Sequence, residues 1–234
     1  MKKGVPLIMF NHVPNEFDVD LVTENINGKR HYVTPSGDKY PSITTVLSIL
    51  SREGIKAWRA RVGEETANAI STKAARRGTN VHYMCEDYIN NELNTSKFLP
   101  NEKELFYSIK PLIDNHINNI HAQEVTLYSD YLRVAGRVDL IAEFDGKLSI
   151  VDFKTSNKRK KKEWIGNYFQ QTSAYAVMYE ERTKIPVSQI VILIAVENDH
   201  PQLFVEKRDD HIHDCIDTIG KYFSETEVIP FQIQ

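Results

Sequence analysis

Hydrophobic and polar residues follow a helical period in the first half of the chain. Apolar positions recur every three or four residues in residues 55–91 and 102–121, which predicts amphipathic helices. Gly78 predicts a break in the first of them. A short helix is expected over residues 43–50, and alternation around residues 29–33 indicates a hairpin or an extended arm.

The period changes to that of β-strands near residue 125. Residues 125–129, 133–144 and 148–153 alternate or run apolar, which predicts three consecutive strands. The dipeptide Asp145-Gly146 separates the last two, and this is a preferred sequence for a tight hairpin turn. The second and third strands are therefore expected to pair with each other.

The rest of the chain returns to a mixed pattern. A helix is expected over residues 163–182, a buried strand over 190–196, a further strand over 203–206 and a closing helix over 209–223. The pattern therefore predicts an α/β domain with a central sheet. The helices that precede the sheet are expected to form a cover or an arch.

The charge is unevenly distributed. The 234 residues include 29 Lys and Arg against 32 Asp and Glu, for a net charge of −3. Residues 154–162 carry six basic side chains and no acidic one, which leaves −9 on the remainder. A uniformly basic surface for coating nucleic acid is excluded, whereas a local basic site is not.

Composition also excludes several classes of protein. The two cysteines, Cys85 and Cys215, are too few for a disulfide scaffold or a four-thiolate iron–sulfur cluster, and neither has zinc-site spacing. No apolar run is long enough for a membrane-spanning helix. The N-terminal pattern lacks the features of a secretory or transit peptide, so a cytoplasmic location is expected.

Three residues near the predicted hairpin carry the candidate chemistry. Asp139 falls inside an otherwise apolar strand, and Asp152 and Lys154 share one face of the next strand because they are two residues apart. Two carboxylates brought together by the hairpin are stabilised by a cation between them, and oxygen ligands suit Mg²⁺ or Mn²⁺. An ammonium there can position or help deprotonate water, or stabilise a phosphoryl group. Phosphodiester hydrolysis fits this set, and a structural ion-pair cluster is the alternative.

Several motifs give the chain a family resemblance. They are GRVD (residues 136–139), VDFKTS (151–156), QTSAY (171–175) and the histidine-containing RGTNVHYMCEDYI (77–89), with weaker signals in the S-x-T of Ser42 to Thr44 and in Trp58-Arg59. Across about residues 41–206 the sequence resembles the PD-(D/E)XK nuclease superfamily. The resemblance implies a restriction-endonuclease-like core, in which helices flank a central mixed sheet, with an N-terminal helical region. Within it, the chain looks like the RecB-like branch, which includes the mitochondrial genome maintenance exonucleases and small phage nucleases.

The resemblance implies roles for individual residues. Binding of one or two Mg²⁺ or Mn²⁺ ions is implied for His82, Asp139, Asp152 and the Phe153 backbone carbonyl, with Glu86 as a further candidate ligand. Catalysis is implied for Lys154, Asp139, Asp152 and Gln171. Tyr175 is expected to support the site or to contact the nucleic-acid backbone, and Thr44 to contact nucleic acid. Glu124 opens the first predicted strand and is treated as a bystander.

A basic segment follows the candidate catalytic strand directly. Lysine runs are ordinarily solvated loops, but beside a phosphodiester site they can bind backbone phosphates. The expected contacts are Lys158, Lys160 and Lys161, with Trp164 as a stacking surface for an unpaired base and Tyr168 as a weaker one. The arginines of the helical region are candidates for the opposite wall of a channel: Arg59, Arg61, Arg76 and Arg77.

The sequence therefore predicts a metal-dependent DNA nuclease, with an exonuclease acting on single-stranded DNA or DNA ends as the leading interpretation. The expected organisation is an N-terminal arm and helical region over residues 1–122 that supplies the histidine, and a nuclease core over 123–234, together forming one compact unit. A structure-specific endonuclease, an RNA-acting nuclease and a non-catalytic DNA-binding recombination module remain alternatives. DNA is the expected partner, and no association with a membrane is expected.

Overall fold

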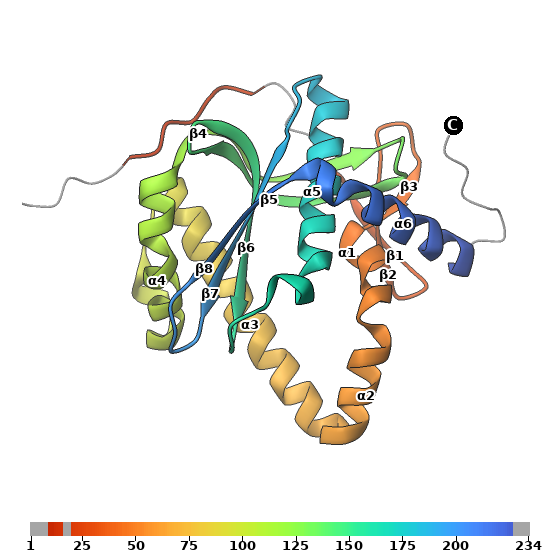
Figure 1. Cartoon of the computed structure of the whole chain (residues 1–234), viewed down its shortest axis with the longest axis horizontal. Coiled ribbons are helices and arrows are strands. Elements are labelled where there is room, and N and C mark those ends of the chain that lie inside the picture. The colour runs from red at the N-terminus through yellow and green to blue at the C-terminus, as the bar shows by residue number, and fades with distance from the viewer. Residues whose placement is uncertain (1–8, 16–19, 227–234) are drawn as a thin grey trace, which may run out of the picture.

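A five-stranded mixed sheet forms the centre of the computed structural model, which describes residues 9–15 and 20–226 (Figure 1). The strands lie in the order β4 (Ile117–Ser129), β5 (Val134–Phe144), β6 (Lys147–Ser156), β7 (Gln189–Val196) and β8 (Gln202–Lys207). Only the β6–β7 pair is parallel. Helix α5 (Gly166–Thr183) makes the crossover that a parallel pair requires.

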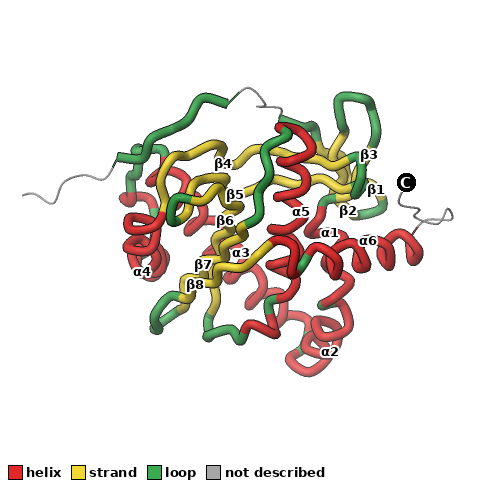
Figure 2. Tube along the Cα trace, turned by 45° about the horizontal axis from the view of Figure 1, so that its top comes forward, coloured by secondary structure: helices red, strands yellow, loops and turns green. Residues whose placement is uncertain are grey.

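Helices cover both faces of this sheet (Figures 1 and 2). Helices α3 (Glu64–Ile89) and α4 (Pro100–His116) pack on one face, while α1 (Ile43–Leu47), α5 and α6 (Ile212–Thr226) pack on the other. The strand residues divide between two cores: Ile150 belongs to the α5 side, and Val151 and Phe153 belong to the α3–α4 side. The predicted fold class, with its β-β-β-α-β core, is confirmed.

A small antiparallel sheet precedes the main one. It contains β1 (Thr23–Ile26), β2 (Lys29–Val33) and β3 (Lys39–Pro41), so the predicted hairpin is present. Ser42 then caps α1, because its side chain accepts a hydrogen bond from the Thr45 amide at 3.1 Å. The described part of the chain also contains four short 3₁₀ turns: Ser48–Leu50, Thr95–Lys97, Lys162–Trp164 and Arg208–Asp210.

The break predicted at Gly78 is wrong. Helix α2 (Arg52–Val62) ends at Gly63, whose φ of +85° is readily adopted only by glycine, and α3 then runs through Gly78 without interruption. At Gly78 an added Cβ would lie 3.6 Å from Thr155 Oγ1, so α3 passes close to β6 there. The two helices form a hairpin that projects from the body (Figure 1).

The helix predicted over residues 102–121 is shorter in the structure at its C-terminal end. Helix α4 stops at His116, and Ile117 opens β4 with a φ of −94° and a ψ of 131°. Ile117 pairs with Phe144 of β5, and Ile120 pairs with Ala142. Pairing with a distant strand therefore overrode a local helical period, which sequence alone could not reveal.

Cys85 and Cys215 are both buried as free thiols on opposite sides of the sheet, the first in α3 and the second in α6. Among the helices of residues 9–15 and 20–226, none combines the length and the apolar character needed to cross a bilayer.

Candidate active site

The β5–β6 hairpin brings the two aspartates together. Its turn, Asp145-Gly146, has positive φ at both residues, and the register that pairs Leu140 with Val151 places Asp139 beside Asp152. The Phe153 amide donates a hydrogen bond of 2.8 Å to Asp139 Oδ2, and Asp152 is only 1% exposed. The proximity expected from sequence is therefore present at the buried end of the hairpin.

Lys154 and Gln171 converge on Asp152. Lys154 Nζ forms an ion pair with Asp152 Oδ2, as expected for two residues on one face of a strand. From α5, Gln171 Nε2 donates a hydrogen bond of 3.2 Å to Asp152 Oδ1. The Tyr168 ring lies 5.2 Å from the same ammonium. One carboxylate thus contacts a cation on its own strand and an amide on the crossover helix.

Tyr175 supports this arrangement from the core. It lies one turn after Gln171, which donates a hydrogen bond of 3.4 Å to its hydroxyl, and the tyrosine is only 2% exposed. A Cβ at Gly136 would come within 2.7 Å of the Tyr175 ring, so the glycine of the GRVD motif makes room for this tyrosine. This burial favours the supporting role over contact with nucleic acid.

His82 joins the site from α3. Its Nδ1 lies 3.5 Å from Asp139 Oδ2, and its ring packs edge-on to Phe153 at 6.4 Å. Together with Glu124 of β4, these two side chains place their ligand atoms within 4.8 Å of one another. Glu124, expected from the sequence to have no role in the site, therefore lies in this cluster.

Glu124 and Asp139 are neighbours on paired strands. The β4–β5 register pairs Gln123 with Leu140 and Val125 with Val138, so the two acids fall opposite each other. Glu124 adopts a φ of +50°, unusual for a residue inside a strand. The sequence shows that Glu124 is present, but it does not reveal the strand pairing that brings Glu124 to the site.

The charged groups of the site shift one another's pKa values. Burial lowers the pKa of His82, but the Asp139 carboxylate more than offsets this and the pKa rises to about 9. Burial, together with Asp139, raises the pKa of Glu124 to about 7. Burial also raises the pKa of Asp152 to about 6, against the opposing effect of Lys154. A site with so many mutually dependent charges is typical of functional chemistry.

The donor set fits a divalent cation. One imidazole nitrogen and two carboxylate oxygens face one another in the His82, Glu124 and Asp139 cluster, a combination suited to Mn²⁺ and, through its oxygens, Mg²⁺. Within the described ranges, buried Asp152 Oδ2 has an ion-pair partner but no aligned hydrogen bond. Asp152 lies outside the tightest cluster, and the roles of the Phe153 carbonyl and Asp152 as ligands remain predictions. Glu86 lines the same cavity as the cluster.

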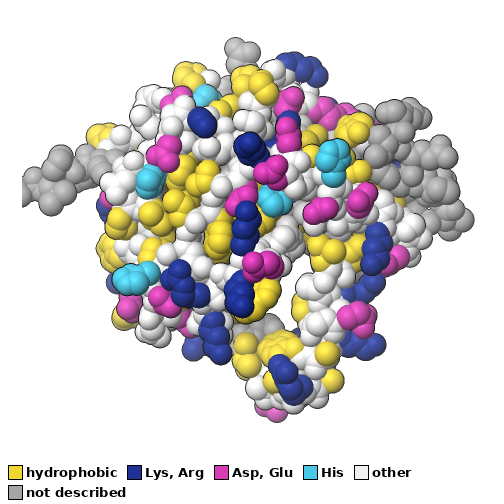
Figure 3. Space-filling view, in the orientation of Figure 1, with side chains coloured by type: hydrophobic (Ala, Val, Ile, Leu, Met, Phe, Trp, Pro, Cys, Tyr) yellow, Lys and Arg dark blue, Asp and Glu magenta, His cyan; other side chains and the backbone are white. Residues whose placement is uncertain are grey.

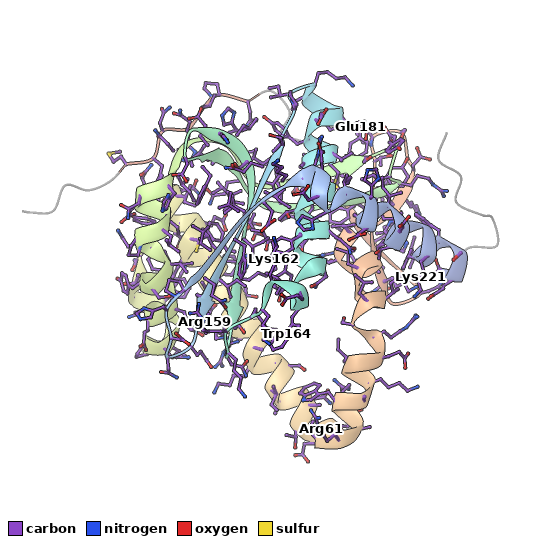
Figure 4. All side chains as sticks on the ribbon, in the orientation of Figure 1. Arg61, Arg159, Lys162, Trp164, Glu181 and Lys221 are labelled. Carbon is purple, nitrogen blue, oxygen red and sulfur yellow. The ribbon has the colours of Figure 1, made fainter. Side chains whose placement is uncertain are left out.

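The basic segment lies beside this site at the end of β6. Trp164 is 63% exposed, and Lys161 lies 5.3 Å from the centre of its ring. Figure 3 shows basic side chains gathered on this face beside a hollow between the body and the α2–α3 hairpin, and Figure 4 shows Arg159, Lys162 and Trp164 along it. Lys162 forms an ion pair with Glu206 at 2.6 Å. The exposed residues available to a strand at this edge are Lys158, Lys161 and Trp164, with Lys160 partly buried.

The arginines expected along a channel wall have different surroundings. Arg77 is 8% exposed and pairs with Glu197 at 2.7 Å, so its assignment to a wall is wrong. Arg59 bonds Glu64 across the hairpin and thereby ties α2 to α3. Arg61 is exposed at the hairpin tip (Figure 4), and Arg76 is exposed on α3. Exposed Thr44 accepts a hydrogen bond of 3.3 Å from Arg30.

The antiparallel β5–β6 hairpin thus presents Asp139 opposite Asp152 and Lys154, and Gln171 lies on the crossover helix. The family model of the PD-(D/E)XK nuclease superfamily matches residues 102–214, which include all four of these residues. The resemblance to this superfamily that the motifs indicate is confirmed over these residues. His82 lies outside the matched range.

Two solved structures show a distant likeness. One is a candidate exonuclease from Eubacterium rectale, with 12% identity over 68% of this chain and 70% of that chain and a TM-score of 0.42. The other is SSO0001, with 13% identity over 76% of this chain and 82% of that chain and a TM-score of 0.39. Neither is similar enough to support a functional argument. No curated protein matches the sequence.

Proposed function

We propose that the chain is a divalent-metal-dependent deoxyribonuclease that degrades single-stranded DNA or DNA ends as an exonuclease. The observation that carries the proposal is the convergence of Asp139, Asp152 and Lys154 at one end of the β5–β6 hairpin, with His82 brought to it from α3. Such a set at the edge of a basic segment fits attack on a phosphodiester. The basic segment adds affinity for a polyanion without regard to sequence.

The metal would be held by His82, Glu124 and Asp139, with Asp152 beside them. When bound, a divalent ion would supply Lewis acidity to the reacting phosphate. Glu86 lines the same cavity and is a candidate for holding a second ion. The structure of the donor set supports either Mg²⁺ or Mn²⁺.

Lys154 would act as a cation in this reaction and not as a base. Burial acts to lower its pKa, but the Asp152 and Asp139 carboxylates outweigh that effect and raise the pKa. The side chain therefore stays protonated at neutral pH. An ammonium in this state can orient the attacking water through its N–H groups and stabilise negative charge that develops on the phosphate.

Gln171 and Tyr175 would position Asp152. The amide of Gln171 bonds one carboxylate oxygen, which leaves the other directed towards Lys154. The buried hydroxyl of Tyr175 restrains the Gln171 amide in turn. These contacts hold the acid in one orientation before substrate arrives, which lowers the reorganisation needed in the transition state.

The exonuclease mode draws support from the α2–α3 hairpin, which projects beside the basic segment and borders a hollow (Figures 1 and 3). A protruding hairpin of this kind can restrict entry to a free strand end. The proposal is tested with end-labelled linear DNA, circular DNA and RNA, each single- and double-stranded, in Mg²⁺, Mn²⁺ or chelator. Release of short products from linear single strands only, with loss in chelator, is expected.

The other outcomes identify the alternatives. Cleavage of circular single-stranded DNA would show an endonuclease, and a preference for RNA would change the substrate class. Tight DNA binding without cleavage in any metal would favour the non-catalytic recombination module and overturn the enzyme proposal.

A further inference from the structure

A cavity of about 560 Å³ opens directly onto the metal-binding cluster. His82, Glu124 and Asp139 line it, together with Arg30 of β2 and Tyr83 of α3. The volume is within the range of sites that hold small organic ligands. Any group bound in this cavity touches the proposed reaction centre, and both Arg30 and Tyr83 lie outside residues 102–214, the part of the chain that matches the family model.

Arg30 has the features of a phosphate ligand. It is exposed and has no carboxylate partner within the ranges 9–15 and 20–226, while its guanidinium donates to Thr44 Oγ1 at 3.3 Å. Arg137 in the same cavity differs, because it pairs with Asp20 at 2.7 Å and with the Glu124 carbonyl. The planar guanidinium of Arg30 therefore retains donors suited to two phosphate oxygens.

Tyr83 has the features of a stacking surface. It follows His82 on α3 and is 49% exposed, although it is a large aromatic side chain. Exposed aromatic rings in a groove bind unpaired bases with little regard to sequence. Tyr168 lies beside Lys154, whereas Tyr83 lines the same cavity as His82. An aromatic ring is thus available near each of these two site residues.

We propose that this cavity binds the nucleotide next to the cleaved bond, with Arg30 on its phosphate and the Tyr83 ring against its base. The inference rests on the proposed nuclease function and names the part of the substrate that this side of the site recognises. It requires an unpaired base, since a base within a duplex does not offer its face to a side chain. The cavity therefore selects single-stranded over double-stranded DNA.

The test measures binding of single-stranded oligonucleotides to the full chain in chelator, where no cleavage occurs. An abasic site is placed at each nucleotide in turn. Wild-type protein is expected to lose about tenfold in affinity at one position next to the cleaved bond, whereas Tyr83→Ala, already about tenfold weaker on the intact strand, loses nothing more at that position. Tyr83→Phe is expected to bind like wild type.

Arg30 is tested in the same assay through its salt dependence. Arg30→Ala should weaken binding and reduce the slope of log affinity against log salt by about 0.7, the value for one lost phosphate contact on a single strand. Arg30→Lys should retain the slope. Exposed residues outside the cavity provide matched controls: Tyr107→Ala on α4 and Lys39→Ala on β3 should leave binding unchanged.

Two results would overturn the inference while leaving the proposed function intact. One is wild-type affinity and salt slope in Tyr83→Ala and Arg30→Ala. The other is an abasic effect that adds to Tyr83→Ala at every position. If wild-type protein neither binds nor cleaves any nucleic acid, the proposed function fails and the inference fails with it.

Discussion

Asp139 and Phe153 are joined across the β5–β6 hairpin by a hydrogen bond of 2.8 Å from the Phe153 amide to the Asp139 carboxylate. This bond links the first acid to the backbone between Asp152 and Lys154, so it fixes the position of Asp139 relative to the strand that carries the other two candidate catalytic residues. A slip of the hairpin register by one residue would turn the second strand's acid and lysine to the opposite face. The geometry of the site therefore depends on the turn and on the sheet around it.

Replacing Asp152 by Asn should lower the rate of DNA cleavage by about three orders of magnitude, because the site loses the negative charge that Lys154 and Gln171 contact. Lys154→Ala should have an effect of similar size. Single-turnover rates measure both, with DNA binding in chelator and far-UV circular dichroism as checks on the fold. Asp145→Asn in the exposed turn is the matched control and should retain full activity. Full activity in purified Asp152→Asn protein would contradict the mechanism.

Glu124→Gln should weaken divalent-metal binding by about 10- to 100-fold, since the change removes one charged oxygen from the cluster with His82 and Asp139. Calorimetric titration with Mn²⁺ measures the affinity, and activity should recover at higher metal concentration. Glu143→Gln, on the same sheet but bonded to Asn119, is the control. Unchanged affinity in Glu124→Gln would remove this residue from the metal site.

Metal affinity should rise as the pH increases from 6 to 9. The pKa values of Glu124 and His82 are raised to about 7 and about 9, so both groups hold protons that a metal must displace. Raising the pH through these values removes that competition, and the titration should release protons into the buffer. Glu124→Gln should abolish the part of the increase centred near pH 7. An affinity independent of pH in the wild type would contradict this assignment.

Gly136→Ala should destabilise the protein by about 1–3 kcal/mol, because the new methyl group would meet the buried Tyr175 ring. The displaced tyrosine would also disturb Gln171, so activity should fall. Gly54→Ala is the contrasting change: the site is open and lies inside α2, and stability should increase by about 0.5–1 kcal/mol. Urea unfolding measures both variants. Equal stability of the two would refute the packing argument.

Removing charge from the basic segment should weaken DNA binding and flatten its salt dependence. Lys158→Ala and Lys161→Ala are each expected to reduce the slope by about 0.7 on single-stranded DNA. Lys160→Ala should do less because this residue is partly buried, and Lys162→Ala should do less because Glu206 already pairs with the ammonium. Fluorescence anisotropy at several salt concentrations measures the slopes. An unchanged slope in all four variants would place this segment outside the interface.

Trp164→Ala should weaken binding of single-stranded DNA by about 1–3 kcal/mol through loss of base stacking. The effect on duplex binding should be smaller, since paired bases are not available to the ring. Trp164→Phe retains an aromatic face and should restore most of the affinity. Equal losses on single- and double-stranded DNA would indicate that the ring contributes to folding or to backbone contact instead.

Several features were predictable because local sequence determines them. The Asp145-Gly146 turn follows from residues that tolerate positive φ, and the two-residue strand period places Asp152 and Lys154 on one face. The helical spacing of Gln171 and Tyr175 likewise predicts that they share a face. These rules use only neighbouring residues.

Other features depended on contacts between distant segments. The helix break falls at Gly63 and not at Gly78. The backbone conformation of Gly63 and the packing of α3 against Thr155 decide this, and the presence of a glycine in the sequence reveals neither. The end of α4 was decided by the pairing of Ile117 with Phe144. The burial of Arg77 beside Glu197 could not be predicted from the sequence either, because an arginine on a helix is expected to be exposed unless its ion-pair partner is known.

Short-range periodicity and turn chemistry specify the hairpin, the Asp-x-Lys strand and the helix that carries Gln171, so these three features can be predicted from neighbouring residues. In contrast, it is the folded arrangement of distant segments that brings Glu124 to His82 and Asp139 and places Arg30 and Tyr83 in their cavity. Those residues come from β4, α3, β5 and β2, which are far apart in the chain. Their meeting depends on strand register and on how α3 packs across the sheet, and neither is encoded in any local pattern.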